Sequence, residues 1–402
     1  MAPLDHNPRL DLLGDYAFTK LAEVLAPLKP KANTEPLLMA AGDPQHSPPA
    51  FAQEVIAANA YLWNRYPGMA GTPQYRMAVA AWLTRRYALP EGMVDPERHI
   101  LALAGTKEGL FMVGQVAVPA EKAGKQPLAL VPNPYYMVYS GAGVMGGAEI
   151  VYLDATKETG FLPDLDAIGE DVLARTGIFY LTTPSNPQGA IASLDYLKKA
   201  IRLARHYGFT LVVDECYAEI YDREPPPGAL EACAAMGENF ANVLVFHSLS
   251  KRSSAAGMRI GFVAGDAELI RLFSALRSYG GTQVPLPIQE AATALWREET
   301  HVVENRAAYR RKFDAAEGVL KGKFGFYRPP GGFFLWLDVG DGERAAIRLW
   351  QEAAVRTLPG GYLARPNRRG INPARNYLRV AIVHHEAIVA EALGRLVRVL
   401  EG

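Results

Sequence analysis

A lysine and an arginine stand next to two short apolar runs near the middle of this 402-residue chain. Lys251 follows the run 243–246, and Arg259 precedes the run 260–264. A lysine in a dry pocket loses its proton more readily and becomes a nucleophile. An arginine offers a planar fork that fits a phosphate. An amine beside a phosphate clamp is what a covalently held pyridoxal phosphate requires, and the alternative is a strand-capping lysine with a surface arginine.

Polar side chains also follow two other apolar runs. Asp214 ends the run 211–213, where a carboxylate is costly unless a cation such as a protonated pyridoxal nitrogen pairs with it. Tyr217 comes three residues later and can hydrogen-bond the ring oxygen. Asn186 follows the run 178–182 in an Asn-Pro turn that can be cis, and its amide would donate to the same oxygen. The alternative for Asn186 is a simple turn.

Two further strand ends carry candidate residues. Gly105, Thr106 and Lys107 open a helix after the run 100–104, and free backbone N–H groups at such a point attract an anion. An ordinary capped helix is the alternative reading. Tyr136 follows the run 128–132, where an aromatic ring can stack on a flat cofactor or simply pack.

The elements that must position these residues form a repeating pattern. Helical segments separate most of the short apolar runs between residues 100 and 265, and this predicts a mostly parallel sheet covered by helices on both faces. Ligands bind beyond the carboxyl ends of such strands. The expected strands are 100–104, 128–132, 150–153, 178–182, 211–213, 243–246 and 260–264, with helices at 106–117, 164–174 and 193–207.

The remaining segments predict a second, smaller α+β unit and flanking helices. Thr72 with Pro73 is a plausible cap and first residue of a helix over 72–87. Helical spacing is found at 9–28, 50–62, 288–320, 343–355 and 386–400, and strands are expected at 324–327, 331–339 and 377–383. The fold class is therefore α/β, with a large sheet-containing domain and a smaller α+β domain.

Composition excludes several classes of protein. The 42 Lys and Arg residues balance the 42 Asp and Glu residues, and no basic tail suggests a nucleic-acid partner. We expect no signal peptide, no membrane span and, with only Cys216 and Cys233, a reduced cytoplasmic setting. The G-x-G-x-x-G match at 141–146 precedes a strand, which argues against dinucleotide binding. His384-His385 lacks matching ligands, so no metal is expected.

The ordered set of residues resembles the pyridoxal-phosphate aminotransferases of classes I and II, which have fold type I, over essentially the whole chain. The resemblance implies that Lys251 forms the internal aldimine and that Asp214 pairs with the pyridine nitrogen. It implies that Asn186 and Tyr217 bond the ring oxygen and that Tyr136 stacks on the ring. The residues that would hold the phosphate are Gly105, Thr106, Lys107, Ser248 and Arg259.

The resemblance also carries expectations about the substrate and the assembly. Tyr66 would reach the phosphate of the neighbouring subunit, so the site would be shared within a homodimer. Arg379, in Leu-Arg-Val-Ala, would bind the substrate α-carboxylate, with Gly42 and Asn186 beside it. The family fold implies a large cofactor-binding domain at 36–288 and a small domain made of 1–35 and 289–402.

Within this family the chain is most similar to the N-succinyldiaminopimelate aminotransferases, on the segments 7–11, 248–253, 257–266 and 330–336. It departs from that group at 253–257, where Ala256 replaces a proline. The likeness implies transfer of an amino group from N-succinyl-L,L-diaminopimelate to a 2-oxo acid such as 2-oxoglutarate, in lysine biosynthesis. The alternatives are an aspartate or general amino-acid aminotransferase and a C–S β-lyase. Candidate cations for the far end of the substrate are Arg9, Arg277 and Arg328, although a surface or packing role is the favoured alternative for each.

Overall fold

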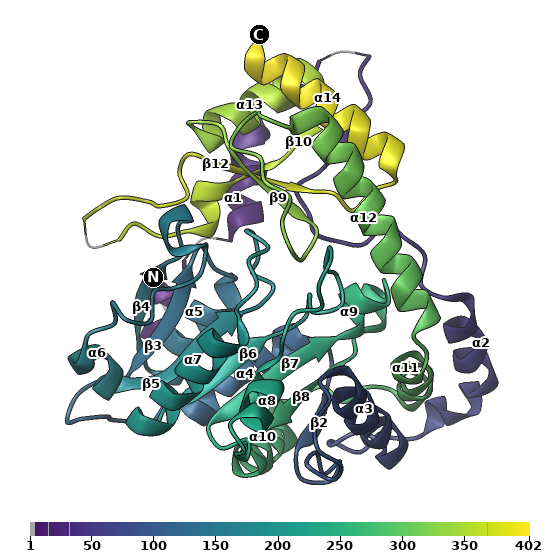
Figure 1. The fold of residues 1–402 in the computed structure, drawn as a ribbon, viewed down its shortest axis with the longest axis vertical. Helices are drawn as coiled ribbons and strands as arrows, with labels where there is room; N and C mark the ends of the chain where they lie inside the picture. The colour runs from purple at the N-terminus through teal and green to yellow at the C-terminus, as the bar shows by residue number, and fades with distance from the viewer. Residues whose placement is uncertain (1–4, 15, 32, 368) are drawn as a thin grey trace.

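The computed structural model describes residues 5–14, 16–31, 33–367 and 369–402. Figure 1 shows two groups of elements, a larger one around a seven-stranded sheet and a smaller one around a three-stranded sheet. Helix α12 (Thr300–Leu320) runs from one group to the other. The expectation for residues 1–35 includes residues 1–4, 15 and 32, which lie outside the described part of the chain.

The seven expected strands of the large sheet are all present. Its order is β2-β8-β7-β6-β5-β3-β4, with β8 antiparallel to both neighbours and the other strands parallel. This confirms the predicted α/β class with a mostly parallel sheet. The strands are β2 (Ile100–Leu103), β3 (Leu128–Asn133), β4 (Glu149–Asp154), β5 (Thr176–Thr182), β6 (Thr210–Asp214), β7 (Val243–Ser248) and β8 (Gly261–Gly265).

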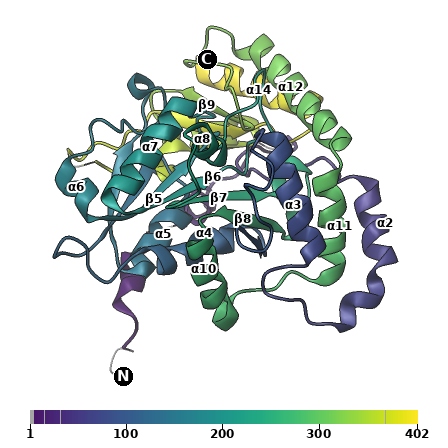
Figure 2. The same cartoon turned by 60° about the horizontal axis from the view of Figure 1, so that its bottom comes forward.

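Helices cover both faces of this sheet, as Figure 2 shows. Successive side chains of a strand point to opposite faces, so Leu211 and Val213 enter one core and Val212 the other. The first core contains residues of α2 (Ala50–Ala58), α3 (Pro73–Arg86), α6 (Glu170–Arg175), α7 (Leu194–Tyr207), α8 (Ala229–Ala235) and α11 (Leu286–Arg297). The second contains residues of α4 (Thr106–Ala117), α5 (Met137–Gly146) and α10 (Ala267–Gly280).

The smaller group packs helices against an antiparallel sheet of order β11-β12-β9. A two-stranded parallel pair, β1 (Leu37–Leu38) with β10 (Val355–Arg356), joins the early chain to this group. Helix α1 (Ala17–Leu25) packs in a small cluster with Leu358. The remaining elements are β9 (Phe334–Asp338), β11 (Leu358–Pro359), β12 (Tyr377–Ala381), α13 (Gly342–Ala353) and α14 (Glu386–Glu401).

Several expectations differ from the structure in detail, and the helical segment expected at 9–28 is a 3-10 helix (Pro8–Leu12) followed by α1. The strand predicted at 324–327 is wrong, because Phe324 and Gly325 have φ values of 49° and 60°, which an extended strand does not allow. The helix predicted at 164–174 begins only at Glu170. The helical segment 288–320 is two helices, and Glu298 between them accepts a 2.6 Å hydrogen bond from the N–H of Thr300. By contrast, the Thr72 side chain caps α3 as expected.

Glycines allow helices α4 and α5 to approach closely. A Cβ on Gly114 would lie 2.3 Å from the carbonyl oxygen of Ala142, and one on Gly146 would lie 2.5 Å from the carbonyl oxygen of Gly114. The G-x-G-x-x-G sequence at 141–146 lies inside α5 and does not form the loop after a strand that dinucleotide binding requires. Its last glycine, Gly146, instead allows α5 to approach α4.

We predict opposite effects for two glycine substitutions in helices. Gly114→Ala should lower the free energy of unfolding by about 1 to 3 kcal/mol, because the new methyl group meets backbone that must move. Gly318→Ala on α12, where nothing lies within 4 Å of the new atom, should raise it by up to about 1 kcal/mol through helix propensity. Urea unfolding of both variants checks this, and equal effects would contradict the packing argument.

Candidate active site

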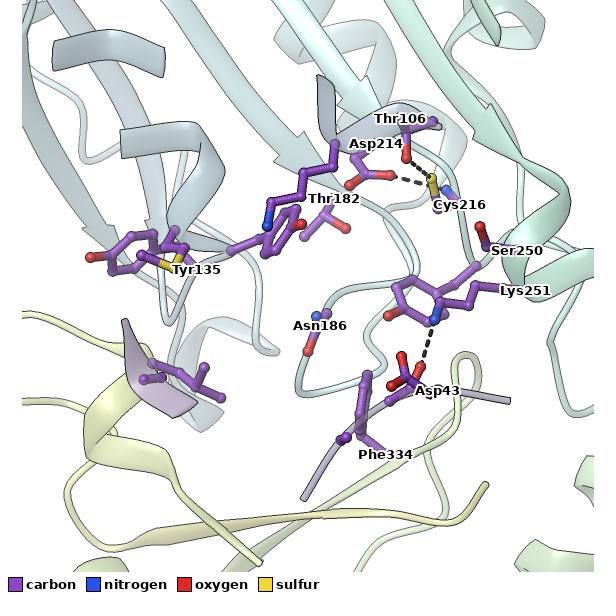
Figure 3. Close-up of a pocket in the computed structure, with 18 of the residues that line it drawn as sticks. Asp43, Thr106, Tyr135, Thr182, Asn186, Asp214, Cys216, Ser250, Lys251 and Phe334 are labelled. Atoms are coloured by element: carbon purple, nitrogen blue, oxygen red, sulfur yellow. Dashed lines mark hydrogen bonds between the residues drawn. The ribbon is translucent and has the colours of Figure 1, made fainter. Parts of the chain in front are cut away.

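A cavity of about 490 Å³ lies beyond the carboxyl ends of β5, β6 and β7 (Figure 3). Segments from both groups of elements line it, because Phe334 and Arg379 of the small sheet face the ends of the large sheet. Most of the predicted site residues line this one cavity: Gly42, Thr106, Lys107, Tyr136, Asn186, Asp214, Tyr217, Ser248, Lys251, Arg259 and Arg379.

Lys251 extends into the cavity from α9 (Leu249–Arg252), which directly follows β7. Its Nζ donates a 2.5 Å hydrogen bond to the carbonyl oxygen of Gly42. Burial lowers the pKa of Lys251 to about 8, and the nearby carboxylate of Asp43 opposes only part of this shift. A share of this amine is therefore neutral near physiological pH, as a nucleophile or proton acceptor must be.

Two other helices hold the backbone of α9 in place. The side-chain amide of Asn305, on α12, donates to the carbonyl oxygens of Lys251 at 3.0 Å and Arg252 at 3.2 Å. The Arg252 guanidinium donates to the carbonyl oxygen of Leu295 at 2.8 Å and pairs with Glu299 at 2.7 Å. The backbone at Lys251 is thus held by contacts with α11 and α12, and no sequence signal connected these distant residues to it.

Asp214 lies at the end of β6 and is almost fully buried. The hydroxyl of Tyr139 donates to its Oδ2 at 2.7 Å, and the backbone N–H of Cys216 donates to its Oδ1 at 3.1 Å. Burial raises the pKa of Asp214, and the hydrogen bonds from Cys216 and Tyr139 with the nearby His247 offset part of that shift. The carboxylate is held firmly, and a cation bound beside it would interact with it favourably.

The start of helix α4 forms a cradle for an anion. Gly105 has a φ of 80°, and a Cβ there would lie 2.2 Å from Nη2 of Arg259, so glycine lets the guanidinium lie against this turn. The hydroxyls of Thr106 and Ser248 line the same cavity, and Ser248 donates to Ser250 at 2.9 Å. Free N–H groups, hydroxyls and a guanidinium together fit a phosphate group.

Arg379 is a buried guanidinium on the other side of the cavity. Its Nη1 donates to Oδ1 of Asn186 at 3.0 Å, and its Nη2 donates to the carbonyl oxygen of Ala40 at 2.9 Å. Its buried Nε has no hydrogen-bond partner within the described ranges. Burial lowers the pKa of Arg379 to about 10, which still leaves it protonated at neutral pH. A buried cation with an unused donor suits the carboxylate of a small ligand.

Some predicted residues lie outside the cavity. Gly105 lies against the guanidinium of Arg259 but does not line the cavity itself, and Tyr66 is 97% exposed on the surface of this single chain. None of the three cations expected at the far end of the substrate lines it. Arg277 is buried against the carbonyl oxygen of Ala102, and Arg328 pairs with Asp222 and Asp314, while Arg9 donates to the carbonyl oxygen of Met145.

Several lining residues were missed by sequence reasoning. Tyr139 stands one helical turn after Tyr136, a spacing that could have indicated it once α5 was expected. The sequence indicates only a small buried residue at Cys216, but its Sγ lies 3.2 Å from the Thr106 hydroxyl in the cavity wall. Asp43 adjoins the predicted Gly42. Behind Asp214, the buried Glu215 lies 2.9 Å from His247 and accepts a hydrogen bond from Tyr87.

Neither a metal cluster nor a membrane helix is found in the described residues. No group of three or more His, Cys, Asp and Glu side chains there could hold a metal ion. No helix of that part of the chain is long and apolar enough to cross a membrane. His384, one of the two adjacent histidines, lies within 3.0 Å of the carbonyl oxygen of Leu38.

The cavity fits pyridoxal 5′-phosphate on three separate observations. The cradle between Gly105 and Arg259 suits the phosphate. The buried carboxylate of Asp214 suits a protonated ring nitrogen, and the Lys251 amine with its lowered pKa suits the aldehyde. The unused donor of Arg379 remains for a substrate carboxylate.

Known proteins agree with this fit. The family model for aminotransferase class I and II matches residues 34–396. An LL-diaminopimelate aminotransferase of Dehalococcoides mccartyi is 32% identical over 365 residues, covering 89% of this chain and 91% of that protein.

Solved structures agree as well. An aminotransferase from Neisseria meningitidis superposes with a TM-score of 0.92 at 37% identity, covering 98% of this chain and 99% of the other. A probable N-succinyldiaminopimelate aminotransferase from Thermus thermophilus has a TM-score of 0.83 at 24% identity, with 96% and 100% covered, which shows the shared fold alone. The chain therefore belongs to the class I and II aminotransferases and is a pyridoxal 5′-phosphate-dependent transaminase.

Proposed function

We propose that this transaminase takes its amino group from an acidic donor of the diaminopimelate series, with N-succinyl-L,L-diaminopimelate as the candidate and a 2-oxo acid such as 2-oxoglutarate as acceptor. The observation that carries the proposal is that Lys251, with its lowered pKa, lines the same cavity as Asp214 and Arg379. Relatives named LL-diaminopimelate aminotransferases support a donor of this series.

The proposed roles follow from the position of each residue. Lys251 would hold the cofactor, and its freed Nζ would take the proton from the substrate α-carbon and hold it for return. Arg379, whose Nη1 donates to Oδ1 of Asn186, would bind the α-carboxylate with Gly42 beside it, and would so point the α-proton toward Nζ. Because Lys251 can both accept and donate the proton, one residue serves as base and acid.

The other predicted residues would hold the cofactor. Asp214 would keep the ring nitrogen protonated, and Tyr139 keeps Asp214 in position. When bound, pyridoxal phosphate supplies an electron sink for negative charge at the substrate α-carbon. The remaining contacts come from three groups of residues: Asn186 and Tyr217 at the ring oxygen, Tyr136 at the ring face, and Gly105, Thr106, Lys107, Ser248 and Arg259 at the phosphate.

We also propose the domain division, the assembly and the location. Residues 36–288 would form the cofactor-binding domain, and 1–35 with 289–402 the small domain, with β1 at the boundary because it pairs with β10. The chain would form a homodimer in which Tyr66 reaches the partner's phosphate. The exposed aromatic residues Tyr61, Trp63 and Tyr66 support an interface on that surface. The free thiols of Cys216 and Cys233 suit a cytoplasmic location.

The Lys251 assignment predicts a selective loss of labelling. Borohydride reduction of the loaded wild-type enzyme should fix the cofactor to Lys251, and the Lys251→Ala variant should show neither this adduct nor turnover. Because the pKa of Lys251 is lowered to about 8, attachment of pyridoxal phosphate to the apoenzyme should quicken as pH rises and level off above that value. Mass spectrometry of peptides locates the adduct.

Lys107, the other lysine of the cavity, is the matched control for this experiment. The Lys107→Ala variant should keep the labelled Lys251 peptide. An adduct on Lys107 in the wild type, or labelling that survives Lys251→Ala, would show that the assignment is wrong.

A panel of amino donors tests the proposed substrate. The value of kcat/KM should be highest for N-succinyl-L,L-diaminopimelate, and lower for L,L-diaminopimelate and aspartate, with 2-oxoglutarate as acceptor. A preference for aspartate would support the alternative aminotransferase. Release of pyruvate from a cysteine conjugate at a comparable rate would instead support the β-lyase reading.

A site shared between two subunits predicts that two impaired variants can restore each other's activity in a hybrid dimer. Tyr66→Ala should lower cofactor affinity and activity, and Lys251→Ala should be inactive. After the two are unfolded and refolded together, each hybrid dimer would contain one site with both Lys251 and Tyr66 intact. Activity should return to roughly a quarter of the wild-type value, because about half of the dimers are hybrid. No recovery, with dimers confirmed by light scattering, would contradict the role of Tyr66.

A further inference from the structure

A second cavity of about 380 Å³ adjoins the active site, and its lining residues have no part in the proposed reaction. Two segments of the chain line both cavities at neighbouring positions. Tyr16 lines the active site and Gly14 the second cavity, while Leu363 lines the active site and Arg365 the second cavity. Residues two apart in sequence are separated by at most about 7 Å, so the two cavities lie next to each other.

Arg365 is the cation of this second cavity, and its backbone is firmly held. Its N–H donates to Oδ1 of Asn133 at 3.0 Å, and its carbonyl oxygen accepts from Nδ2 of Asn133 at 2.9 Å. Its guanidinium occupies the space beside Gly14, where a Cβ would lie only 1.5 Å from Nη2. The backbone of Arg365 is therefore fixed beside the end of β3 by its hydrogen bonds to Asn133.

The groups that act on the Arg365 side chain are hydroxyls. Burial disfavours its charge, but Tyr135 and Tyr152 act in the opposite direction and the pKa of Arg365 is raised. Among the residues that the structure describes, no carboxylate forms an ion pair with Arg365. Asp11, which lines the same cavity, lies 2.9 Å from His6. The guanidinium of Arg365 therefore has tyrosine hydroxyls and not a carboxylate as its neighbours in that part of the chain.

Tyr135 and Tyr152 stand between the two cavities. Their ring centres are 5.1 Å apart, with Tyr135 lining the active site and Tyr152 lining the second cavity. In the view of Figure 3, Tyr135 lies on the far side of the pocket from Lys251, with Asn186 between them. A ligand that places its reacting end at Lys251 and extends past Asn186 would approach this pair of tyrosines and the guanidinium behind them.

We propose that Arg365, with the hydroxyls of Tyr135 and Tyr152, forms a subsite for the far carboxylate of the amino donor. This inference rests on the proposed function and names the chemical class that the site prefers. A donor with a carboxylate on a long chain reaches the subsite, whereas aspartate and glutamate carry their second carboxylate too close to the α-carbon. A far-end ammonium group, as in free diaminopimelate, would meet the like charge of Arg365. Acylation by a dicarboxylic acid removes that ammonium and adds a carboxylate.

The test compares long and short donors in the same variant. In Arg365→Gln, kcat/KM for N-succinyl-L,L-diaminopimelate should fall about 10- to 100-fold, mainly through KM, because a charge-assisted pair is lost. The half-reaction with L-glutamate should stay within about twofold of wild type, since glutamate does not reach the subsite. Tyr152→Phe, which keeps the ring and removes the hydroxyl, should give a smaller loss in the same direction.

Arg9→Gln is the control for loss of a nearby surface cation. Arg9 donates to the carbonyl oxygen of Met145 and lines neither cavity, so both donors should be unaffected. An equal loss for both donors in Arg365→Gln, or no loss for either, would overturn the subsite.

The same measurements separate the two proposals. Wild-type turnover of the succinylated donor with an unaffected Arg365→Gln variant would overturn the subsite and leave the proposed function in place. A wild type that rejects the succinylated donor would overturn the proposed function. If kcat/KM for another long dicarboxylic donor then depends on Arg365, the subsite is supported.

Discussion

The hydrogen bond between Arg379 and Asn186 joins the two sheets at the point where the chemistry takes place. Arg379 belongs to the small antiparallel sheet, and Asn186 follows β5 of the large parallel sheet. The same guanidinium also holds the carbonyl oxygen of Ala40, next to the short strand β1. Burying an arginine costs free energy that hydrogen bonds to its donors offset, and the two bonds of this residue tie three separate segments together around one cavity.

Lys251 depends on a second set of contacts between distant segments. Its helix, α9, has four residues and cannot be stable alone. Asn305 of α12 holds its last carbonyl groups, and Arg252 anchors it to the end of α11. Because α12 spans both groups of elements, the position of the reactive amine is coupled to the arrangement of the whole chain.

Two charged side chains of the site have interactions left unused until small molecules bind. Among the described residues, Asp214 is buried with hydrogen-bond donors but without a cation in contact, and Arg379 has an unused donor. Each of these costs free energy in the empty protein and favours a ligand of opposite charge. In our proposal Arg365 extends this arrangement beyond the cofactor, because it offers a further positive charge along the line that a long substrate would follow.

The large sheet and its strand ends follow from the amino-acid sequence alone. Seven apolar runs became seven strands, because a parallel sheet buried on both faces needs continuous apolar residues. Polar residues that end such strands must meet at one edge, and for this reason Asp214, Asn186 and Lys251 could be grouped before the structure was known. The strand expected at 324–327 failed because local apolar composition does not reveal a backbone with positive φ.

Packing across the whole chain selects which residues support the reactive groups and which cations face a ligand. Tyr139, Asn305 and Arg365 act across long separations in sequence. The spacing of residues along the chain does not indicate such contacts. Arg9, Arg277 and Arg328 were candidate substrate readers, with a surface or packing role as the favoured alternative, and each is engaged by carbonyl groups or carboxylates elsewhere. An arginine's role depends on whether its donors are already satisfied, and only the folded chain determines that.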